Sequence, residues 1–131
     1  MARTRQNFSS DSAFEPAYGF SRVVRVGDLV FVSGTTAIRA DGSMEGGADG
    51  YGQAMATFRK IAGFLEQAGA STGDIVRTRI FVKDMAAYDG IERAHREFFG
   101  EIRPAATLVE VSGFVRPDML LEVEVDVVVA G

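Results

Sequence analysis

The chain has 131 residues, of which 47% are hydrophobic and 24% charged, a composition that predicts one globular domain. The net charge is −4 without a run of Lys or Arg, which argues against a nucleic-acid partner, since such surfaces concentrate basic residues. Cysteine is absent and histidine occurs once, which excludes disulfides, thiol nucleophiles and multi-histidine metal sites, so we expect neither a metal nor another cofactor.

The N-terminal segment, residues 1–17, is polar and lacks periodicity, which predicts a flexible tail ahead of a domain over residues 18–131. Residues 1–6 are basic, but the apolar segment that a signal peptide requires does not follow them. No apolar run reaches the roughly 18–20 residues that span a bilayer. We therefore expect a cytoplasmic protein without a membrane partner.

Two short apolar runs follow, over residues 20–26 and 29–35, and Gly27-Asp28 separates them. Strand-like runs with such a pair between them are typical of a β-hairpin. Residues 38–52 are rich in glycine and acidic residues, which predicts a loop. This loop lacks the Gly-Lys-Ser/Thr ending of a phosphate-binding loop, so phosphate binding has little support.

Two helices with a strand between them make up the middle of the chain. Apolar residues recur at helical spacing over residues 51–68 and 84–99, and Gly69 and Gly100 follow the two runs. Residues 75–83 alternate, which predicts a strand. Its two faces are Val76, Thr78, Ile80 and Val82, and Arg77, Arg79, Phe81 and Lys83. His95 falls on the apolar stripe of the second helix, where a lone histidine is more often structural than catalytic.

The C-terminal stretch, residues 103–129, holds two strand-like runs joined by a turn. The second run places Glu122, Glu124 and Asp126 on one face and aliphatic residues on the other, which predicts a half-buried strand. Like charges in a row repel one another, so they need water or cationic partners. The acidic face is either a solvated sheet surface or the lining of a subunit interface or ligand cleft.

The order of these elements predicts a mixed sheet that carries both helices on one face. The other face would then be uncovered and would carry Arg77, Arg79 and the three carboxylates beside Phe31 and Phe81. A face that is both charged and apolar is usually covered by another subunit. The pattern therefore predicts an oligomer.

Several short motifs occur in the order seen in the Rid family, the reactive intermediate deaminases, also known as endoribonuclease L-PSP-like proteins. The matching segments are Gly27 to Gly34, Gln53, Gly69-Ala70-Ser71, Asp74-Ile75-Val76, Phe98-Phe99-Gly100, Arg103-Pro104-Ala105, Val109-Glu110-Val111 and Leu121-Glu122-Val123-Glu124. No single motif is specific, but their joint order over residues 18–129 resembles that family.

The resemblance implies a chorismate-mutase-like α+β fold, a homotrimer, and small-molecule clefts between neighbouring subunits. In active members an arginine holds the substrate carboxylate, and a carboxylate assists a water that hydrolyses an imine or enamine to a carbonyl and ammonia. A guanidinium suits this role because it binds a carboxylate through two parallel hydrogen bonds. The attacking water needs a nearby proton acceptor.

The motif residues carry over only in part. Glu122 matches the carboxylate, while Ser33 and Gly34 match the strand end in the cleft. Phe20 stands where the active group usually has tyrosine. Ala106 stands where the Pro-Ala-Arg-Ser/Thr motif has its arginine, with Thr107 after it. We therefore expect ordinary 2-imino acids to be poor substrates.

A relocated arginine could take the place of the missing one. Arg77, Arg79 and Arg103 are the candidates, although the odd spacing of Arg103 from Ala106 along an extended chain would put it on the opposite face.

Three functions remain open. The first is an imine or enamine hydrolase with an unidentified substrate, and the second is a trimer that binds a metabolite without turnover. The third is the ribonuclease activity of the family's older name, against which the acidic charge balance argues.

Overall fold

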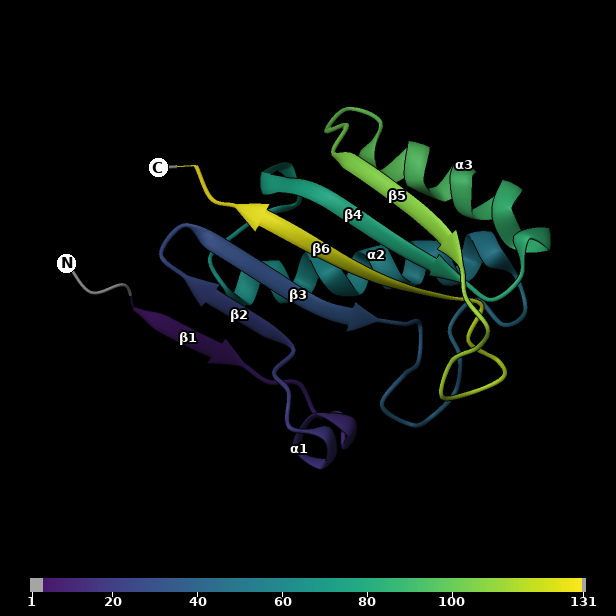
Figure 1. The fold of residues 1–131 in the computed structure, drawn as a ribbon, viewed down its shortest axis with the longest axis horizontal. Helices are drawn as coiled ribbons and strands as arrows, with labels where there is room; N and C mark the ends of the chain where they lie inside the picture. Colours follow the sequence, from purple (N-terminus) through teal and green to yellow (C-terminus); the bar gives the residue numbers. More distant parts are fainter. Residues whose placement is uncertain (1–3, 131) are drawn as a thin grey trace.

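Six strands form one mixed sheet in this computed structural model, which describes residues 4–130 (Figure 1). The strands are β1 (Arg5–Phe8), β2 (Val23–Val26), β3 (Leu29–Thr35), β4 (Ile75–Val82), β5 (Ala105–Glu110) and β6 (Leu121–Val128). Their order across the sheet is β1-β2-β3-β6-β4-β5. β4 and β5 are parallel, whereas the other neighbouring pairs are antiparallel. The last strand of the chain thus lies inside the sheet.

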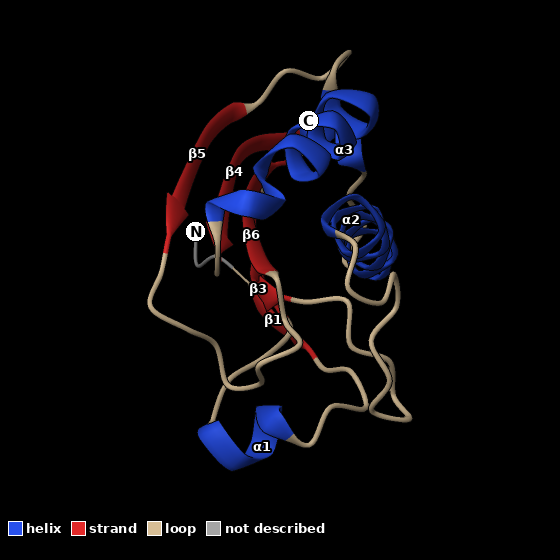
Figure 2. Cartoon of the chain, turned by 90° about the vertical axis from the view of Figure 1, so that its right-hand side faces the viewer, coloured by secondary structure: helices blue, strands red, loops and turns tan. Residues whose placement is uncertain are grey.

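Both long helices, α2 (Gly50–Gln67) and α3 (Tyr88–Phe99), lie on the same face of this sheet (Figure 2). Short 3-10 turns at Thr72–Asp74 and Met85–Ala87 precede β4 and α3, and the small helix α1 (Phe14–Tyr18) lies beyond one end of the sheet. The predicted α+β architecture, with two helices on one face of a mixed sheet, is confirmed. None of the described helices has the length and apolar character needed to cross a membrane.

Helix α2 begins and ends where its sequence provides caps. The side chain of Asp49 accepts a hydrogen bond from the Gly52 amide, which satisfies one of the free N–H groups of the first turn. Gly69, with φ +76°, follows the last turn in the left-handed conformation that glycine adopts without strain. Between these caps the apolar stripe is buried against the sheet, and Phe58, Ile61 and Leu65 are fully buried.

Strand β6 supplies the sheet side of the core. Its aliphatic residues at positions 121, 123, 125 and 127 are at most 1% exposed, as the alternation predicts. Burying one such side chain stabilises the fold by about 1.5–3 kcal/mol. The acidic residues between them lie on the face without helices, and Figure 1 shows that face of the sheet toward the viewer. The alternation of this strand therefore sets which side chains can form a site.

Strand β4 departs from its predicted alternation at one position. The register with β6 shifts between Ile75 and Arg77, so Val76 is an extra residue in the strand. Ile75 is buried toward the helices, and Val76 is 46% exposed. The prediction that Val76 shares the buried face of Thr78 is therefore wrong, because a bulge breaks the period of two.

The N-terminal segment has more structure than the sequence predicts. Residues 5–8 form β1, which pairs with β2 at the edge of the sheet, and Glu15 in α1 is only 2% exposed. The predicted flexible tail, residues 1–17, thus contains a strand and a buried carboxylate, while its first three residues lie outside the described part. The polar sequence gave no sign of the strand, because an edge strand with one solvated face needs few apolar residues.

Gln53, the residue that matches the family at the start of α2, is fully buried. Its side-chain amide donates to the carbonyl oxygens of Gly47 and Asp118, at 2.6 and 2.9 Å, and its Oε1 accepts from the Leu120 amide at 3.0 Å. One side chain therefore joins α2 to the loop before it and to the loop that leads into β6. These bonds fix the end of the sheet where Glu122 lies.

Candidate functional site

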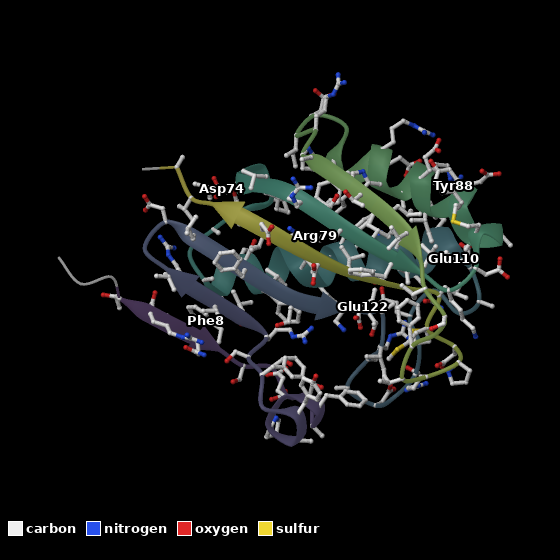
Figure 3. All side chains as sticks on the ribbon, viewed as in Figure 1. Phe8, Asp74, Arg79, Tyr88, Glu110 and Glu122 are labelled. Atoms are coloured by element: carbon white, nitrogen blue, oxygen red, sulfur yellow. The ribbon has the colours of Figure 1, made fainter. Side chains whose placement is uncertain are left out.

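The uncovered sheet face carries a row of charges over its central strands. Arg79 of β4 lies between two carboxylates of β6: its Nη1 is 2.9 Å from Asp126 Oδ2 and 3.5 Å from Glu124 Oε1. The third carboxylate, Glu122, lies opposite Phe81, and none of the salt bridges among the described residues reaches it. Figure 3 shows Arg79 over the middle of the sheet and Glu122 farther along, where β3 ends.

The carboxyl group of Glu122 lies directly against Gly34. A Cβ atom at position 34 would be 2.7 Å from Glu122 Oε1 and 2.8 Å from its Cδ, so glycine leaves room for the carboxyl group where it lies and a larger residue would displace it. Burial raises the pKa of Glu122, the nearby Glu124 raises it further, and Arg22 opposes both by lowering it. A half-buried carboxyl with a raised pKa is suited to accept and return a proton.

Arg22 lies behind this position and is 9% exposed. Its Nη1 donates to the carbonyl oxygen of Gly34 at 2.8 Å and to the hydroxyl of Thr35 at 3.1 Å. Its Nε is 3.7 Å from a carboxylate oxygen of the buried Glu15, too far for a hydrogen bond. The guanidinium also lies over the ring of Phe20, 5.3 Å from the centroid. A buried cation thus holds the strand end beneath Glu122.

Phe20 and Ser33 occupy the same region. Ser33 belongs to β3, and its hydroxyl donates to the Ser21 carbonyl at 2.6 Å, which ties β3 to the segment before β2. Phe20 is half-buried and meets Tyr18 edge to face at 6.0 Å. Four of the predicted site residues, Phe20, Ser33, Gly34 and Glu122, therefore gather at one end of the sheet.

Ala106 and Thr107 lie elsewhere, on the edge strand β5. Ala106 is opposite Thr78 of β4, whose hydroxyl contacts His95 of α3, so Ala106 faces the helices. It lines an open groove of about 400 Å³ between α3 and β5. Thr107 is opposite Arg79 and so faces the uncovered side. Within one chain the position of the missing arginine is therefore on the opposite sheet face from Glu122.

His95 lies on the apolar stripe of α3, as predicted. Its Nε2 is 2.9 Å from Thr78 Oγ1, and its ring packs 4.7 Å from that of Phe99 and 5.9 Å from that of Phe58. Burial lowers the pKa of the imidazole, which favours the neutral ring. These contacts are those of a core histidine, although one side of the ring also lines the groove next to Ala106.

One of the three arginines considered as substitutes is placed differently from the prediction. Arg103 precedes β5 and has a φ of +54°, so the spacing rule for an extended chain does not apply to it. It lines a second hollow along α3 that shares His95 and Arg96 with the groove at Ala106, on the same side rather than the opposite one. Arg79 is held by two carboxylates, and Arg77 is opposite Asp126 in the sheet.

Arg22 and Glu15 are the site residues that the sequence analysis missed. Glu15 belongs to the segment read as a tail, and Arg22 to a stretch read as an ordinary strand. The sequence offered one indication of this pair: Arg22 is a charged residue directly before the apolar run from Val23 to Val26. Lys60 was missed as well: from α2 its Nζ donates to the carbonyls of Thr36 and Ile38, at 2.8 and 2.9 Å.

Over residues 4–130, no cluster of three or more His, Cys, Asp or Glu side chains is arranged to hold a metal ion.

Comparison with known proteins gives a consistent result. The sequence profile of the endoribonuclease L-PSP family matches residues 10–129. An uncharacterized protein from Streptomyces coelicolor is 36% identical over 117 residues, 89% of this chain and 87% of that protein. The 3-aminoacrylate deaminase RutC of Acinetobacter baylyi is 31% identical over 108 residues, 82% of this chain and 85% of the enzyme.

Solved structures agree with the sequence relatives. A YjgF/YER057c/UK114 family member from Mycobacterium tuberculosis superposes with a TM-score of 0.87 at 41% identity, and the match covers 96% of this chain and all of that one. The chain therefore belongs to the endoribonuclease L-PSP family, the family of the Rid and YjgF proteins.

Proposed function

We propose that this protein hydrolyses a small imine or enamine to a carbonyl compound and ammonia, with Glu122 as the proton-transfer group. The observation that carries the proposal is the Glu122 carboxyl: half-buried, outside any salt bridge among the described residues, and seated on a glycine that leaves room for it. Glu124 and Asp126 share its strand and face, but Arg79 engages both of them. Membership of a family with a named deaminase adds to this support.

The proposed reaction needs one general base and one proton donor, and a single carboxyl can serve as both. An enamine first takes a proton from solvent at carbon and becomes an iminium ion, the form that an imine reaches by protonation at nitrogen. Glu122 then accepts a proton from water as the oxygen bonds to the iminium carbon, which gives a neutral carbinolamine. The protonated Glu122 gives that proton to the nitrogen; as the C–N bond breaks and ammonia leaves, the hydroxyl proton passes back to Glu122, the carbonyl forms, and Glu122 releases the proton to solvent. The raised pKa of Glu122 makes its carboxylate a better proton acceptor than an ordinary glutamate.

We further propose that the complete site forms between chains of a homotrimer. Large apolar side chains stand among the charges of the uncovered face, with Phe31 on β3, Val109 on β5 and Val128 on β6 each 44% exposed. A surface of this mixed character is suited to association with another copy. Glu122 and Ala106 lie on opposite faces of one sheet, so a ligand that contacts both positions must lie between two chains.

Light scattering should give about 42 kDa, three times the 14.1 kDa of one chain, and a monomer at micromolar concentration would contradict the trimer.

The substrate should differ from an ordinary 2-imino acid. Position 106 has a methyl group where an arginine would hold a carboxylate, and loss of such a clamp weakens binding by a few kcal/mol. A panel of 3-aminoacrylate, short 2-imino acids and uncharged imines, all generated in situ, would define the class through ammonia release. We expect the uncharged imines to react faster than the carboxylates.

The Glu122→Gln variant tests the chemistry, because the amide keeps the shape and removes the base. We expect turnover to fall about 10²–10⁴-fold, the range for loss of a general base. Glu124→Gln is the matched control, since it removes a carboxylate two residues away on the same face and should retain most of the activity. Equal losses in the two variants would assign the effect to the charge of the face and contradict a catalytic Glu122.

Binding of a metabolite without turnover is the second candidate, and Ala106 is the observation that favours it. In that case a ligand would protect the protein against heat, yet no member of the panel would release ammonia. The ribonuclease activity of the family's name has weaker support, because the chain carries a net charge of −4. A salt-dependent RNA-binding assay addresses it directly.

A further inference from the structure

Arg22 places a guanidinium in the interior of the protein, where it is 9% exposed. Placing a guanidinium in the interior costs several kcal/mol unless its partners are well placed. Its salt-bridge partner Glu15 is 2% exposed but 3.7 Å away, and the buried Nε has no hydrogen-bond partner among the described residues. An apolar or amide side chain could fill this space at lower cost. The pair with Glu15 therefore does not account for this buried charge, and its remaining contacts are with the strand end at Gly34 and Thr35.

Arg22 is connected to the proposed catalytic carboxyl of Glu122 through a single residue, Gly34. Its Nη1 holds the carbonyl oxygen of Gly34 at 2.8 Å, and Gly34 is the residue on which the Glu122 carboxyl lies. Its guanidinium also contacts the rings of Phe20 and Phe64, at 5.3 and 5.8 Å from their centroids. Arg22 thus fixes the floor beneath Glu122 and one of its aromatic neighbours.

The other charges around Glu122 are either repulsive or already engaged. Glu124 on the same strand is a like charge. Arg79 of β4 is bound to Glu124 and Asp126, and the ammonium of Lys83, the residue after β4, donates to the Pro117 carbonyl at 2.6 Å. From β3, the neighbouring residues are the uncharged Ser33 and Gly34. Lys60 of α2 and Glu15 of α1 act on Arg22 itself. Arg22 is therefore the cation placed to stabilise ionised Glu122.

We propose that Arg22 is a positioning residue of the Glu122 site: it holds Gly34 in place and sets the pH range in which Glu122 acts as a base. This role rests on the proposed hydrolase function for its catalytic meaning. The electrostatic link between Arg22 and Glu122, however, is measurable without a substrate.

The first experiment follows the titration of Glu122 by NMR in protein with ¹³C-labelled glutamate carboxyls, with the signal assigned through Glu122→Gln. Removing a cation disfavours the ionised form, so Arg22→Gln should move the Glu122 midpoint to higher pH. Arg22→Lys keeps the charge and should move it less. Arg25→Gln is the control, because Arg25 also donates to main-chain carbonyls, of Gly27 and Ala68, and should leave the midpoint unchanged.

The second experiment follows the pH profile of ammonia release. In Arg22→Gln the acid limb of the profile should move to higher pH together with the NMR midpoint. If the midpoint rises by about one pH unit, activity on the acid limb should fall about tenfold, while the alkaline plateau falls less. A residue with a purely structural role would lower activity equally at every pH. Arg22→Lys should restore part of the original profile.

A folding defect is a separate risk, because Arg22→Gln leaves the buried Glu15 carboxylate without its cation. The double variant Glu15→Gln, Arg22→Gln removes both buried charges and tests the same change of midpoint in a neutral interior. An unchanged Glu122 midpoint in either folded variant overturns the role of Arg22. A raised midpoint in a protein that hydrolyses nothing in the panel supports the Arg22–Glu122 link and overturns the hydrolase instead.

Discussion

Glu122 and Glu124 stand two residues apart on the same face of β6, yet their surroundings differ. Glu124, with Asp126, is engaged by Arg79 on the neighbouring strand, and both carboxylates are about a third exposed. Glu122 has Phe81 and Gly34 beside it and a buried arginine behind it. By their spacing along the strand, the two carboxylates look equivalent. Their neighbours on the adjacent strands differ, and this makes Glu124 a salt-bridge partner and Glu122 a candidate base.

The largest expected effect tests the alternation on which this comparison rests. Val123 lies between the two glutamates, points to the opposite side and is fully buried. Val123→Asp should destabilise the fold by about 3–5 kcal/mol, because it buries a charge without a partner. Urea denaturation measures this. Val115→Asp is the control, since that valine is 76% exposed and the change should have little effect. Equal stability of the two variants would show that Val123 does not face the core and that the two faces of β6 are assigned the wrong way round.

The next prediction tests the space around Glu122, which Glu124 does not share. Gly34→Ala places a Cβ 2.7 Å from Glu122 Oε1 and should displace the carboxyl group without touching the Arg79 network. A misplacement of about 1 Å lowers turnover on the order of 10²-fold, so we expect a loss of about 10–100-fold in ammonia release. Gly63→Ala serves as the control, because a Cβ there meets no atom within 4 Å. Full activity in Gly34→Ala would show that the position of Glu122 is unimportant.

A smaller gain is expected at the other half of the site. Ala106→Arg adds a carboxylate clamp in a groove with room for it, and hydrolysis of short 2-imino acids should rise about tenfold, the equivalent of about 1.4 kcal/mol. The gain should disappear in the double variant with Glu122→Gln, which the same ammonia assay measures. If the unmodified protein already hydrolyses 2-imino acids rapidly, another arginine binds the carboxylate, and Arg103 is then the first to replace.

The smallest effect is on the pH dependence of stability. A carboxyl whose pKa is raised by folding stabilises the folded state below its unfolded pKa, and this contribution is lost as the pH rises through the folded pKa. Glu122→Gln removes that loss, so it should stabilise the protein more at pH 7.5 than at pH 4, by less than about 1 kcal/mol because solvent screens the half-exposed group. Glu124→Gln instead loses a salt bridge and should slightly destabilise the protein at pH 7.5, as urea denaturation at both values would show.

Most of the fold was predictable because periodicity reports burial. The alternation of β6, the stripes of α2 and α3 and the Gly27-Asp28 turn each correspond to an observed element. Val76 was misplaced because a bulge depends on the partner strand, which a single segment does not encode. The strand at residues 5–8 was missed because its pairing with β2, and not its own apolarity, holds it.

The site was predictable only where a motif marks it. Gly34 and Glu122 follow from the resemblance to the family, and the structure brings them into contact. The Arg22–Glu15 pair joins a segment read as a tail to the start of a strand, and neither position has a pattern that points to the other. Contacts of this kind arise from tertiary packing, so sequence periodicity has no means to report them.

The side chain of Gln53 couples the movements of the two loops beside Glu122. Because its amide bonds the loop before α2 at Gly47 and the loop before β6 at Asp118 and Leu120, neither loop can leave its place without breaking bonds that also restrain the other. Amide hydrogens of the two loops should therefore exchange with solvent at matched rates, as one cooperative unit. A ligand that orders one loop would then slow exchange in the other, although the two are far apart in the sequence.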